Sequence, residues 1–306
     1  MCSRSLGWTA NREGARPQVL QRLDNLRDSS VLSYLLRSCR DLKALSEGRR
    51  LHALIVKTGL HSYGLVSMYG KCGRIERAQF VFATLESRSV VSWNAIIGAH
   101  VLNNYALEGI RLFKSMITEG IEPNRITFMS VLSACGSPAT LDEGKFIHAC
   151  IVDCGLMADI AVGSALVSMY SKCEDLNLAK SVFDELRDKD LVAWNCLITG
   201  YARHGRGQEA LSVYARMLLE GFHPNKVTFL VALNACVTKD TVVQGMLLHS
   251  SIVECGFICD VILENALINS YGKLDALVEA IIVFDKMPTR DVVSWNTIVS
   301  ACVQGN

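Results

Sequence analysis

The chain has 306 residues, is 50% hydrophobic and has a formal net charge of +1. This charge gives no general attraction to polyanions, and the apolar runs are too short to form a membrane-spanning helix. The twelve cysteines and seven histidines form no Cys-x-x-Cys and no His-x-Glu sequence, so the zinc and proton-shuttle motifs of a nucleobase deaminase are absent from this sequence.

Residues 1–28 lie before the first recognisable repeat. They contain five arginines and only three acidic residues. An organellar transit peptide has this composition, and so does a plain disordered tail. Both readings stay open for this segment.

From residue 29 onwards the chain is internally repetitive. Trp93, Trp194 and Trp295 fall at a constant interval of 101 residues, and the text around them recurs, as in Val-Ser-Trp-Asn at 91–94 and again at 293–296. A register kept over this length indicates an array of repeats.

Each 101-residue period divides into units of 35, 35 and 31 residues. The predicted units are 90–124, 125–159, 160–190, 191–225, 226–260, 261–291 and a partial unit 292–306. Residues 29–89 form an earlier round that lacks about five residues at a junction near Tyr63. Because the chain stops inside a unit, we expect it to be a fragment or truncated product of a longer protein.

Within a unit the pattern predicts helix, turn, helix. Trp93, Ile96 and Ile97 have the spacing of one apolar helical face. Gly120 followed by Pro123 predicts the end of the second helix. No segment alternates with period two. The sequence therefore predicts an all-α, right-handed solenoid of stacked helix-turn-helix repeats, a superhelix like that of tetratricopeptide repeats, in which stacking buries the apolar face of each hairpin.

Cysteines recur at fixed places in the repeats. Cys135 and Cys236 share one place, and Cys154 and Cys255 share another. Recurrence at repeat positions favours small buried apolar side chains over metal or redox sites, and it favours a reducing compartment.

Unit lengths and motif text together resemble the pentatricopeptide repeat proteins of land plants, in the subfamily whose P, L and S motifs run in triplets. Val-Ser-Trp-Asn-Ala-Ile-Ile-Gly fits a P motif, Gly-Lys-Phe-Ile-His-Ala an L motif and Ser-Met-Tyr-Ser-Lys-Cys an S motif. The resemblance covers roughly residues 29–306. It implies an organellar protein, of mitochondrion or chloroplast, that binds single-stranded RNA at about one base per repeat.

In this family the fifth and last residues of a motif are held to read the base edge, and the second residue packs on the base. Carried over to this sequence, the reading residues are Asn94 with Asn124, Ser164 with Asp190, Asn195 with Asn225, Asn265 with Asp291, and Asn296 in the partial unit. The stacking residues are Val91, Ala161, Val192, Ile262 and Val293.

The resemblance assigns pyrimidine, guanine, pyrimidine and uracil to the four complete pairs. The L units have Met129 with Asp159 and Leu230 with Asp260. Because methionine and leucine cannot hydrogen-bond a base edge, these units are left blank. The expected target is 5′-Y-n-G-Y-n-U-3′.

Each of these residues also has an ordinary structural interpretation. An asparagine that follows tryptophan near a helix start is often a cap or a polar surface residue, and asparagine next to proline at the end of a unit is ordinary turn chemistry. Tryptophans on an apolar face pack between repeats, and His148 and His249 are expected to make packing contacts. Tyr63 occupies the fifth position of an S unit that ends at Ser89, and we expect that unit not to read a base in the usual way.

The sequence thus predicts a specificity factor for RNA editing, modification or processing of an organellar transcript. An editing or processing enzyme would act in trans. We expect no catalytic residue, metal or cofactor, and no membrane or small-molecule partner. The rival interpretation is a helical scaffold that binds protein, or a non-functional fragment.

Overall fold

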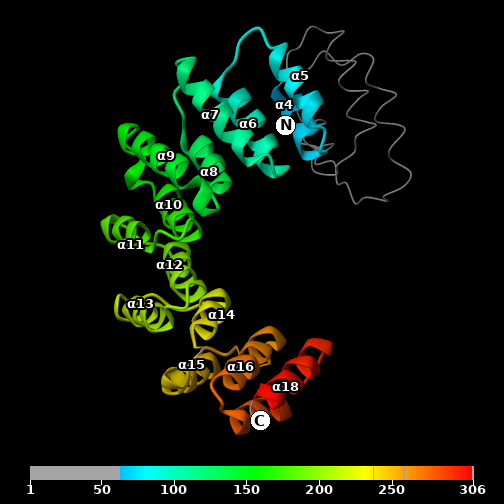
Figure 1. Ribbon diagram of the computed structural model, residues 1–306, viewed down its shortest axis with the longest axis vertical. Coiled ribbons are helices and arrows are strands. Elements are labelled where there is room, and N and C mark those ends of the chain that lie inside the picture. Colours follow the sequence, from blue (N-terminus) through cyan, green and yellow to red (C-terminus); the bar gives the residue numbers. More distant parts are fainter. Residues whose placement is uncertain (1–62, 237, 258, 305–306) are drawn as a thin grey trace, which may run out of the picture. The chain divides into compact units, whose positions relative to one another are not determined.

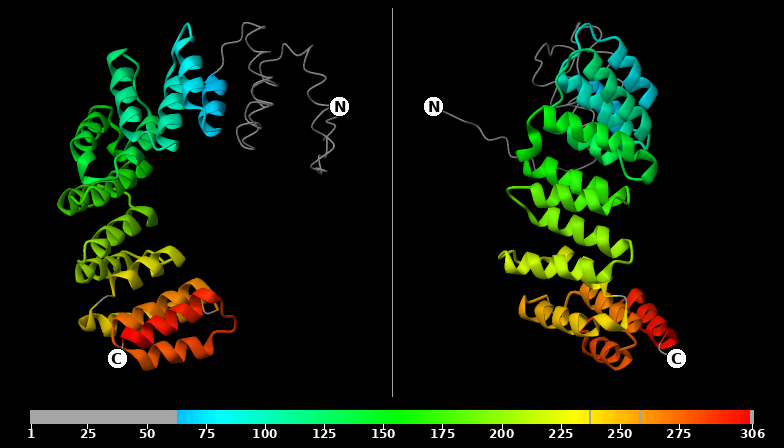
Figure 2. Two further views of the ribbon diagram at one scale, coloured as in Figure 1. Left: turned by 45° about the vertical axis from the view of Figure 1, so that its right-hand side comes forward. Right: turned by 60° about the vertical axis from the view of Figure 1, so that its left-hand side comes forward.

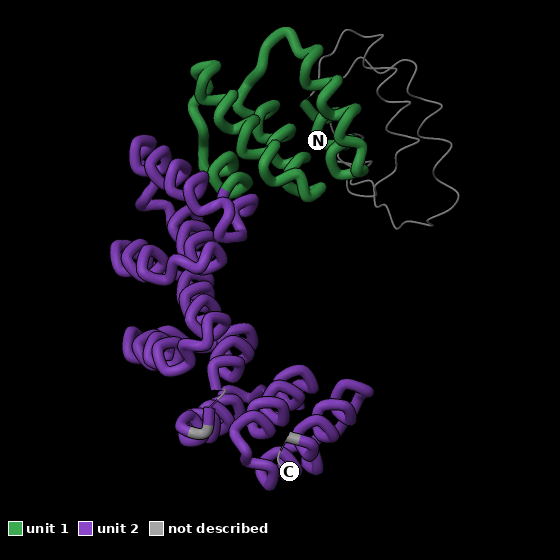
Figure 3. The backbone as a smooth tube through the Cα atoms, in the orientation of Figure 1, with its two compact units in different colours: residues 1–131 green, residues 132–306 purple. Residues whose placement is uncertain are grey.

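The computed structural model describes residues 63–236, 238–257 and 259–304, which form α-helices and short 3-10 turns and no strand (Figure 1). The possible transit peptide and most of the predicted unit round 29–89 lie outside these residues. No helix in the described part of the chain has the length and apolar character needed to cross a membrane. The chain divides into two compact units, residues 1–131 and 132–306 (Figure 3).

In unit 1 the helices form antiparallel pairs joined by short turns. They are α4 (Tyr63–Lys71), α5 (Ile75–Ala83), α6 (Val90–Leu102) and α7 (Ala106–Thr118), followed by α8 (Arg125–Ala134), which runs into unit 2. Asn103 and Asn104 form the turn between α6 and α7, where Asn104 adopts a left-handed backbone conformation with φ of 66°.

Unit 2 repeats the same arrangement. Its α-helices are α9 (Leu141–Asp153), α10 (Ile160–Lys172), α11 (Leu176–Glu185), α12 (Leu191–Arg203), α13 (Gly207–Leu219), α14 (Lys226–Ala235), α15 (Val242–Glu254), α16 (Val261–Lys273), α17 (Leu277–Lys286) and α18 (Val292–Gln304). Short 3-10 turns, which were not predicted, precede α9 and α15 at Pro138–Thr140 and Lys239–Thr241.

The first helices of successive pairs lie side by side in unit 2, where α10, α12, α14, α16 and α18 follow one another (Figure 2). Small residues allow this approach. A Cβ added to Gly200 of α12 would lie 2.7 Å from Oγ of Ser171 on α10, and one added to Gly272 of α16 would lie 2.8 Å from Cβ of Ala301 on α18. The backbones of neighbouring first helices therefore pack with almost no side chain between them.

The recurring tryptophans pack between repeats, as predicted. Trp194 is fully buried, with Phe183 edge-on at 4.6 Å between ring centroids and the Arg216 guanidinium 5.6 Å from its ring. Trp93 is buried in the same way against Phe82. Trp295 makes the corresponding contact with Phe284 yet is 57% exposed.

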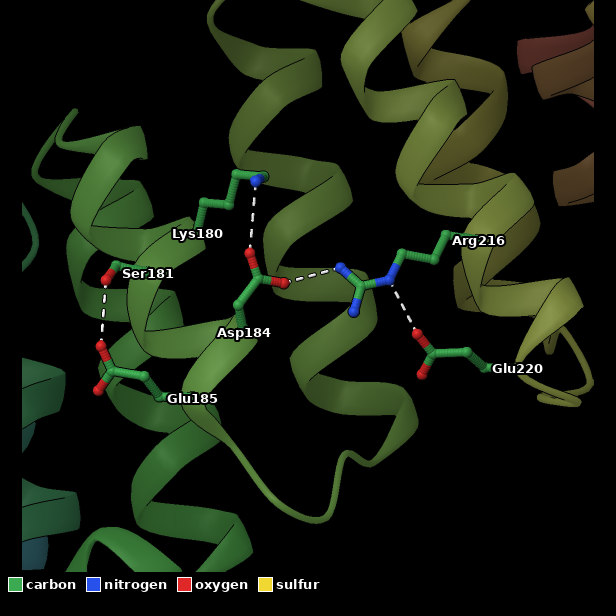
Figure 4. A network of polar contacts seen from close by, with 6 residues as sticks. All are labelled: Lys180, Ser181, Asp184, Glu185, Arg216 and Glu220. Atoms are coloured by element: carbon green, nitrogen blue, oxygen red, sulfur yellow. Dashed lines mark hydrogen bonds and ion pairs between the residues drawn. The ribbon is translucent and has the colours of Figure 1, made fainter.

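An ion-pair network joins the second helices of neighbouring repeats in unit 2. Asp184 of α11 accepts a hydrogen bond of 2.7 Å from Arg216 of α13, and it also pairs with Lys180 at 3.3 Å (Figure 4). Arg216 pairs with Glu220 at 2.8 Å as well. Because these groups are partly exposed, they orient α11 and α13 more than they stabilise them.

His148 and His249 make the predicted packing contacts. Nδ1 of His148 lies 2.9 Å from the hydroxyl of Tyr170, and Nδ1 of His249 lies 3.0 Å from that of Tyr271. Each bond joins the second helix of an L unit to the first helix of the following S unit.

The prediction for the cysteines is correct in part. Cys135, Cys173 and Cys236 are buried small side chains, and burial raises the pKa of the Cys135 thiol to about 12. Cys154 and Cys255 are exposed at the ends of α9 and α15, so the expectation of burial is wrong for these two. Recurrence at a repeat position does not show whether a side chain faces a neighbouring helix or the solvent.

Candidate nucleic-acid interface

Exposed β-branched side chains mark the second position of the units. Val91, Val192, Ile262 and Val293, four of the five predicted stacking residues, are exposed at the first turn of their helices, and Ala161 is partly buried. Their exposure leaves apolar surface available to a planar partner. The structure adds Ile126 and Val227, which are exposed at the same position of the L units. These two residues were not predicted, because the L units have no polar fifth residue, although their register in the repeat is visible in the sequence.

Three of the four complete predicted reading pairs are brought together by a direct hydrogen bond. Asn94 Nδ2 donates to Asn124 Oδ1 at 3.1 Å, and Asn265 Nδ2 donates to Asp291 Oδ1 at 3.4 Å. In the 160–190 unit the hydroxyl oxygen of Ser164 and Oδ1 of Asp190 are 2.8 Å apart.

That third pair is formed by Ser164, whose hydroxyl donates to Oδ1 of Asp190. The fourth pair, Asn195 with Asn225, makes no direct hydrogen bond within the described residues; both line one pocket. Asn296 is exposed on α18, and its partner position lies beyond residue 306.

The last residue of each pair is also a helix cap. Asp190 Oδ1 accepts from the backbone N–H of Ala193 at 2.8 Å, and Asn225 Oδ1 accepts from that of Thr228 at 2.9 Å. Asn124 and Asp291 cap their helices through the same atom. The asparagines that follow tryptophan, for which capping was the alternative interpretation, lie inside their helices, and the caps are the last residues of the units. Capping does not compete with the reading role, since a cap uses only one of the two polar atoms.

Capping uses one polar atom of the last residue of each pair and so determines which polar atom of that side chain stays outside the cap. A backbone N–H must meet an oxygen, so the amide of Asn124 or Asn225 is oriented with Oδ1 towards the helix and Nδ2 away from it. For Asp190 and Asp291 the remaining atom is Oδ2. The remaining group is thus a donor in the P units and an acceptor in the S units.

The carboxylate of Asp291 is held in its ionised form. Hydrogen bonds from the backbone N–H and the hydroxyl of Ser294 hold the pKa of Asp291 below its ordinary value. A charged acceptor of this kind forms stronger hydrogen bonds with N–H donors than a neutral one does.

The fifth residues differ in how they are satisfied. Asn94 Oδ1 accepts from the hydroxyl of buried Thr127 at 2.6 Å, which holds this amide against the first helix of the next unit. Asn195 Oδ1 and Asn265 Oδ1 are buried and have no hydrogen-bond partner among the described residues. An unsatisfied acceptor costs free energy when it is buried, so these two oxygens lack the stabilisation that Asn94 Oδ1 has.

A pocket of about 360 Å³ contains the Asn195–Asn225 pair. It lies between α10, α12 and the start of α14. Its lining includes Val192, Val227, Asn195, Asn225, Lys172 and Arg203. Apolar second residues of two successive units, one reading pair and two cations thus line a single space.

The L unit 226–260 has a different arrangement. Leu230 offers no polar atom, as predicted. Asp260 caps α16 through Oδ1, which accepts from Ile262 N–H at 3.0 Å, while its Oδ2 lies 2.7 Å from Nζ of Lys226. Partial burial acts to raise the pKa of Asp260, but the hydrogen bond and charge of Lys226 and the backbone N–H groups of Leu263 and Ile262 together outweigh it, and the pKa lies below its ordinary value.

Comparison with known proteins identifies the repeats. A model described as PPR repeat family matches residues 88–137 and 189–238, and one described as PPR repeat matches residues 164–191 and 265–292. Both models describe a repeat and not a catalytic domain. Within the described residues, no three His, Cys, Asp or Glu side chains gather as a group that could hold a metal ion.

Curated relatives from Arabidopsis thaliana are named pentatricopeptide repeat-containing proteins. The chloroplastic At4g18520 is 35% identical over 87% of this chain, and the mitochondrial At2g03380 is 34% identical over 90%. The chloroplastic CRR2 is 33% identical over 98%. The chain spans 44%, 41% and 46% of these three proteins. These locations agree with the predicted organellar location, and they include both organelles.

Solved structures agree with the fold. The pentatricopeptide repeat protein PPR10 from maize is 17% identical, with a TM-score of 0.54, over 95% of this chain and 49% of that chain. A second structure, PPR10 in complex with an 18-nt psaJ RNA element, gives a TM-score of 0.55 at 17% identity over 85% of this chain and 44% of that chain. The predicted α-solenoid of helical repeats is confirmed. Since the two family models together match half of the sequence, this chain belongs to the pentatricopeptide repeat family.

Proposed function

We propose that this chain binds single-stranded RNA in a sequence-selective manner, at about one base per P or S unit. It would belong to the P, L and S triplet subfamily and select a site on an organellar transcript for editing, modification or processing by an enzyme that acts in trans. The observation that supports this proposal best is the recurring pair at the fifth and last positions, whose last member is fixed by capping so that one known polar atom stays available.

Similarity to PPR10, which was solved with an RNA element, supports the choice of ligand. The exposed second residues support the geometry, because β-branched side chains such as Val192 and Val227 on both sides of a pocket can hold a flat base between them. Base stacking of this kind tolerates any base, while the reading pair supplies the selection.

The first test is a filter-binding titration with a short RNA containing 5′-YnGYnU-3′ and a scrambled control, at two salt concentrations. We expect a clear preference for the designed RNA. Replacing Asn195 and Asn225 together by alanine should remove the preference at that position. Equal, weak and strongly salt-sensitive binding to both RNAs would contradict the proposal and favour the protein-scaffold reading, which the net charge of +1 supports.

A second prediction concerns Lys172 and Arg203, which are exposed in the last turns of α10 and α12 and line the same pocket. Their positions suit contacts with two phosphates. Replacing both with glutamine should lower the slope of log K against log salt by about 1.4, because each phosphate contact on a single strand contributes about 0.7.

The matched control for this variant is Lys180→Gln. Lys180 lies on α11 in the outer ion-pair network, so its loss should leave the salt dependence nearly unchanged. Base preference should survive in the double variant, since phosphate contacts position the strand and do not read it. An unchanged slope would show that the two cations do not touch the RNA.

A further inference from the structure

The two L units share a charge pattern that the P and S units lack. Each begins with a basic residue and ends with aspartate: Arg125 with Asp159, and Lys226 with Asp260. The first residues of the complete P and S units are aliphatic, namely Val90, Ile160, Leu191 and Val261. A cation at the first position is therefore specific to the units that have no polar fifth residue.

In the 226–260 unit this cation acts on the last residue directly. Lys226 is the first residue of α14, and its Nζ lies 2.7 Å from Oδ2 of Asp260, the cap of α16. Oδ1 of the same carboxylate accepts two backbone N–H groups, from Ile262 at 3.0 Å and Leu263 at 3.2 Å. Both oxygens of Asp260 are thus engaged within the protein.

The S units provide the contrast. Asp190 and Asp291 cap their helices through Oδ1 in the same way, and their Oδ2 atoms take part in no ion pair or hydrogen bond among the described residues. Asp260 differs from them in two neighbours: Leu230 stands where Ser164 or Asn265 donates a hydrogen bond, and the Lys226 ammonium lies on Oδ2.

We propose that Lys226 is a specificity-determining residue that masks Asp260 and so makes the 226–260 unit indifferent to the base opposite it. This inference rests on the proposed RNA-reading function. It assigns the blank character of the L unit to two features: Leu230, which cannot hydrogen-bond, and an ion pair that occupies the only remaining acceptor.

The hydrogen-bonding groups of the bases predict which bases the unit would prefer if the ion pair between Lys226 and Asp260 were removed. Guanine and uracil present a ring N–H on their Watson–Crick edge, whereas adenine and cytosine present a ring nitrogen lone pair there. A free carboxylate oxygen opposite this ring atom accepts from the first two and faces a lone pair in the others, whose only donor on that edge is the exocyclic amino group. Freed of Lys226, Asp260 should therefore favour guanine and uracil over adenine and cytosine.

The test uses four RNAs of the sequence 5′-YnGYNU-3′ that differ only at N, the base opposite the 226–260 unit. We expect the unaltered chain to bind all four within about twofold, and Lys226→Gln to bind the guanine and uracil forms about tenfold more tightly than the adenine and cytosine forms, as for one hydrogen bond to a charged acceptor. In Lys226→Gln/Asp260→Asn this discrimination should disappear, while asparagine keeps the cap on α16.

Controls distinguish a failure of the masking proposal from a failure of the proposed RNA-reading function. Lys180→Gln removes the same charge from α11 and should leave all four affinities in proportion, and thermal unfolding checks that each variant folds. Discrimination at the 160–190 unit serves as the internal reference. If it persists while Lys226→Gln gains none, or if the unaltered chain already discriminates at N, masking is wrong and the proposed function stands. Loss of discrimination at every position would overturn both.

Discussion

Replacement of Asn225 by aspartate is expected to turn the 191–225 unit from one that accepts both pyrimidines into one that prefers uracil over cytosine by about tenfold. Both side chains can cap α14 through Oδ1, where Asn225 now accepts from the Thr228 N–H at 2.9 Å. The change replaces the outward donor, Nδ2, with a charged acceptor. Uracil offers its ring N–H to that acceptor, while cytosine presents a lone pair.

The substitution creates the same residue pair that the 261–291 unit already has in Asn265 and Asp291. The reciprocal variant, Asp291→Asn, should relax selection for uracil at its own position and serves as the matched control. Titration of the two variants against RNAs that differ only in cytosine or uracil at each position measures the effect. A loss of affinity for both bases in Asn225→Asp, with no change in their ratio, would mean that position 225 only caps the helix.

Replacement of Trp194 by alanine is expected to have the largest effect on stability, about 3–5 kcal/mol, because it opens a cavity at the contact between two repeats. Trp194 is fully buried against Phe183 and Phe222 and beneath the Arg216 guanidinium. In a repeat array the loss should unfold neighbouring repeats together, since their stability depends on the interfaces between them. Urea and thermal unfolding followed by far-ultraviolet circular dichroism measure it.

Trp295→Ala is the matched control, because Trp295 occupies the same place in its repeat and contacts Phe284 edge-on, yet is 57% exposed. Its removal should cost less than about 1 kcal/mol, the range of most surface substitutions and aromatic pair contacts. Similar losses in the two variants would contradict the assignment of Trp194 to the core of the array. A changed base preference in a folded Trp194 variant would instead place the ring at the RNA.

Much of the fold was predictable from the sequence, because the length of each repeat can be read from the interval at which residues recur. The interval between Trp93 and Trp194 defined the units, and apolar spacing within one unit gave the helices α6 and α7 nearly to their ends. The sequence could not show which recurring side chains are buried. Cys135 and Cys154 recur equally well, yet only Cys135 is buried, because burial depends on the neighbouring helix that covers each position.

The sequence by itself determined the all-α repeat architecture and, through its resemblance to a family, the positions of the candidate reading and stacking residues. Local patterns suffice for this, since helix periodicity, turn residues and motif length are read along the chain. Only the tertiary structure decided what those side chains do to one another. It placed Ser164 on Asp190, fixed the orientation of Asn225 by capping and brought Lys226 onto Asp260. These contacts join residues 26 to 34 positions apart or set the orientation of an amide, and both depend on how successive helices pack, which no local pattern states.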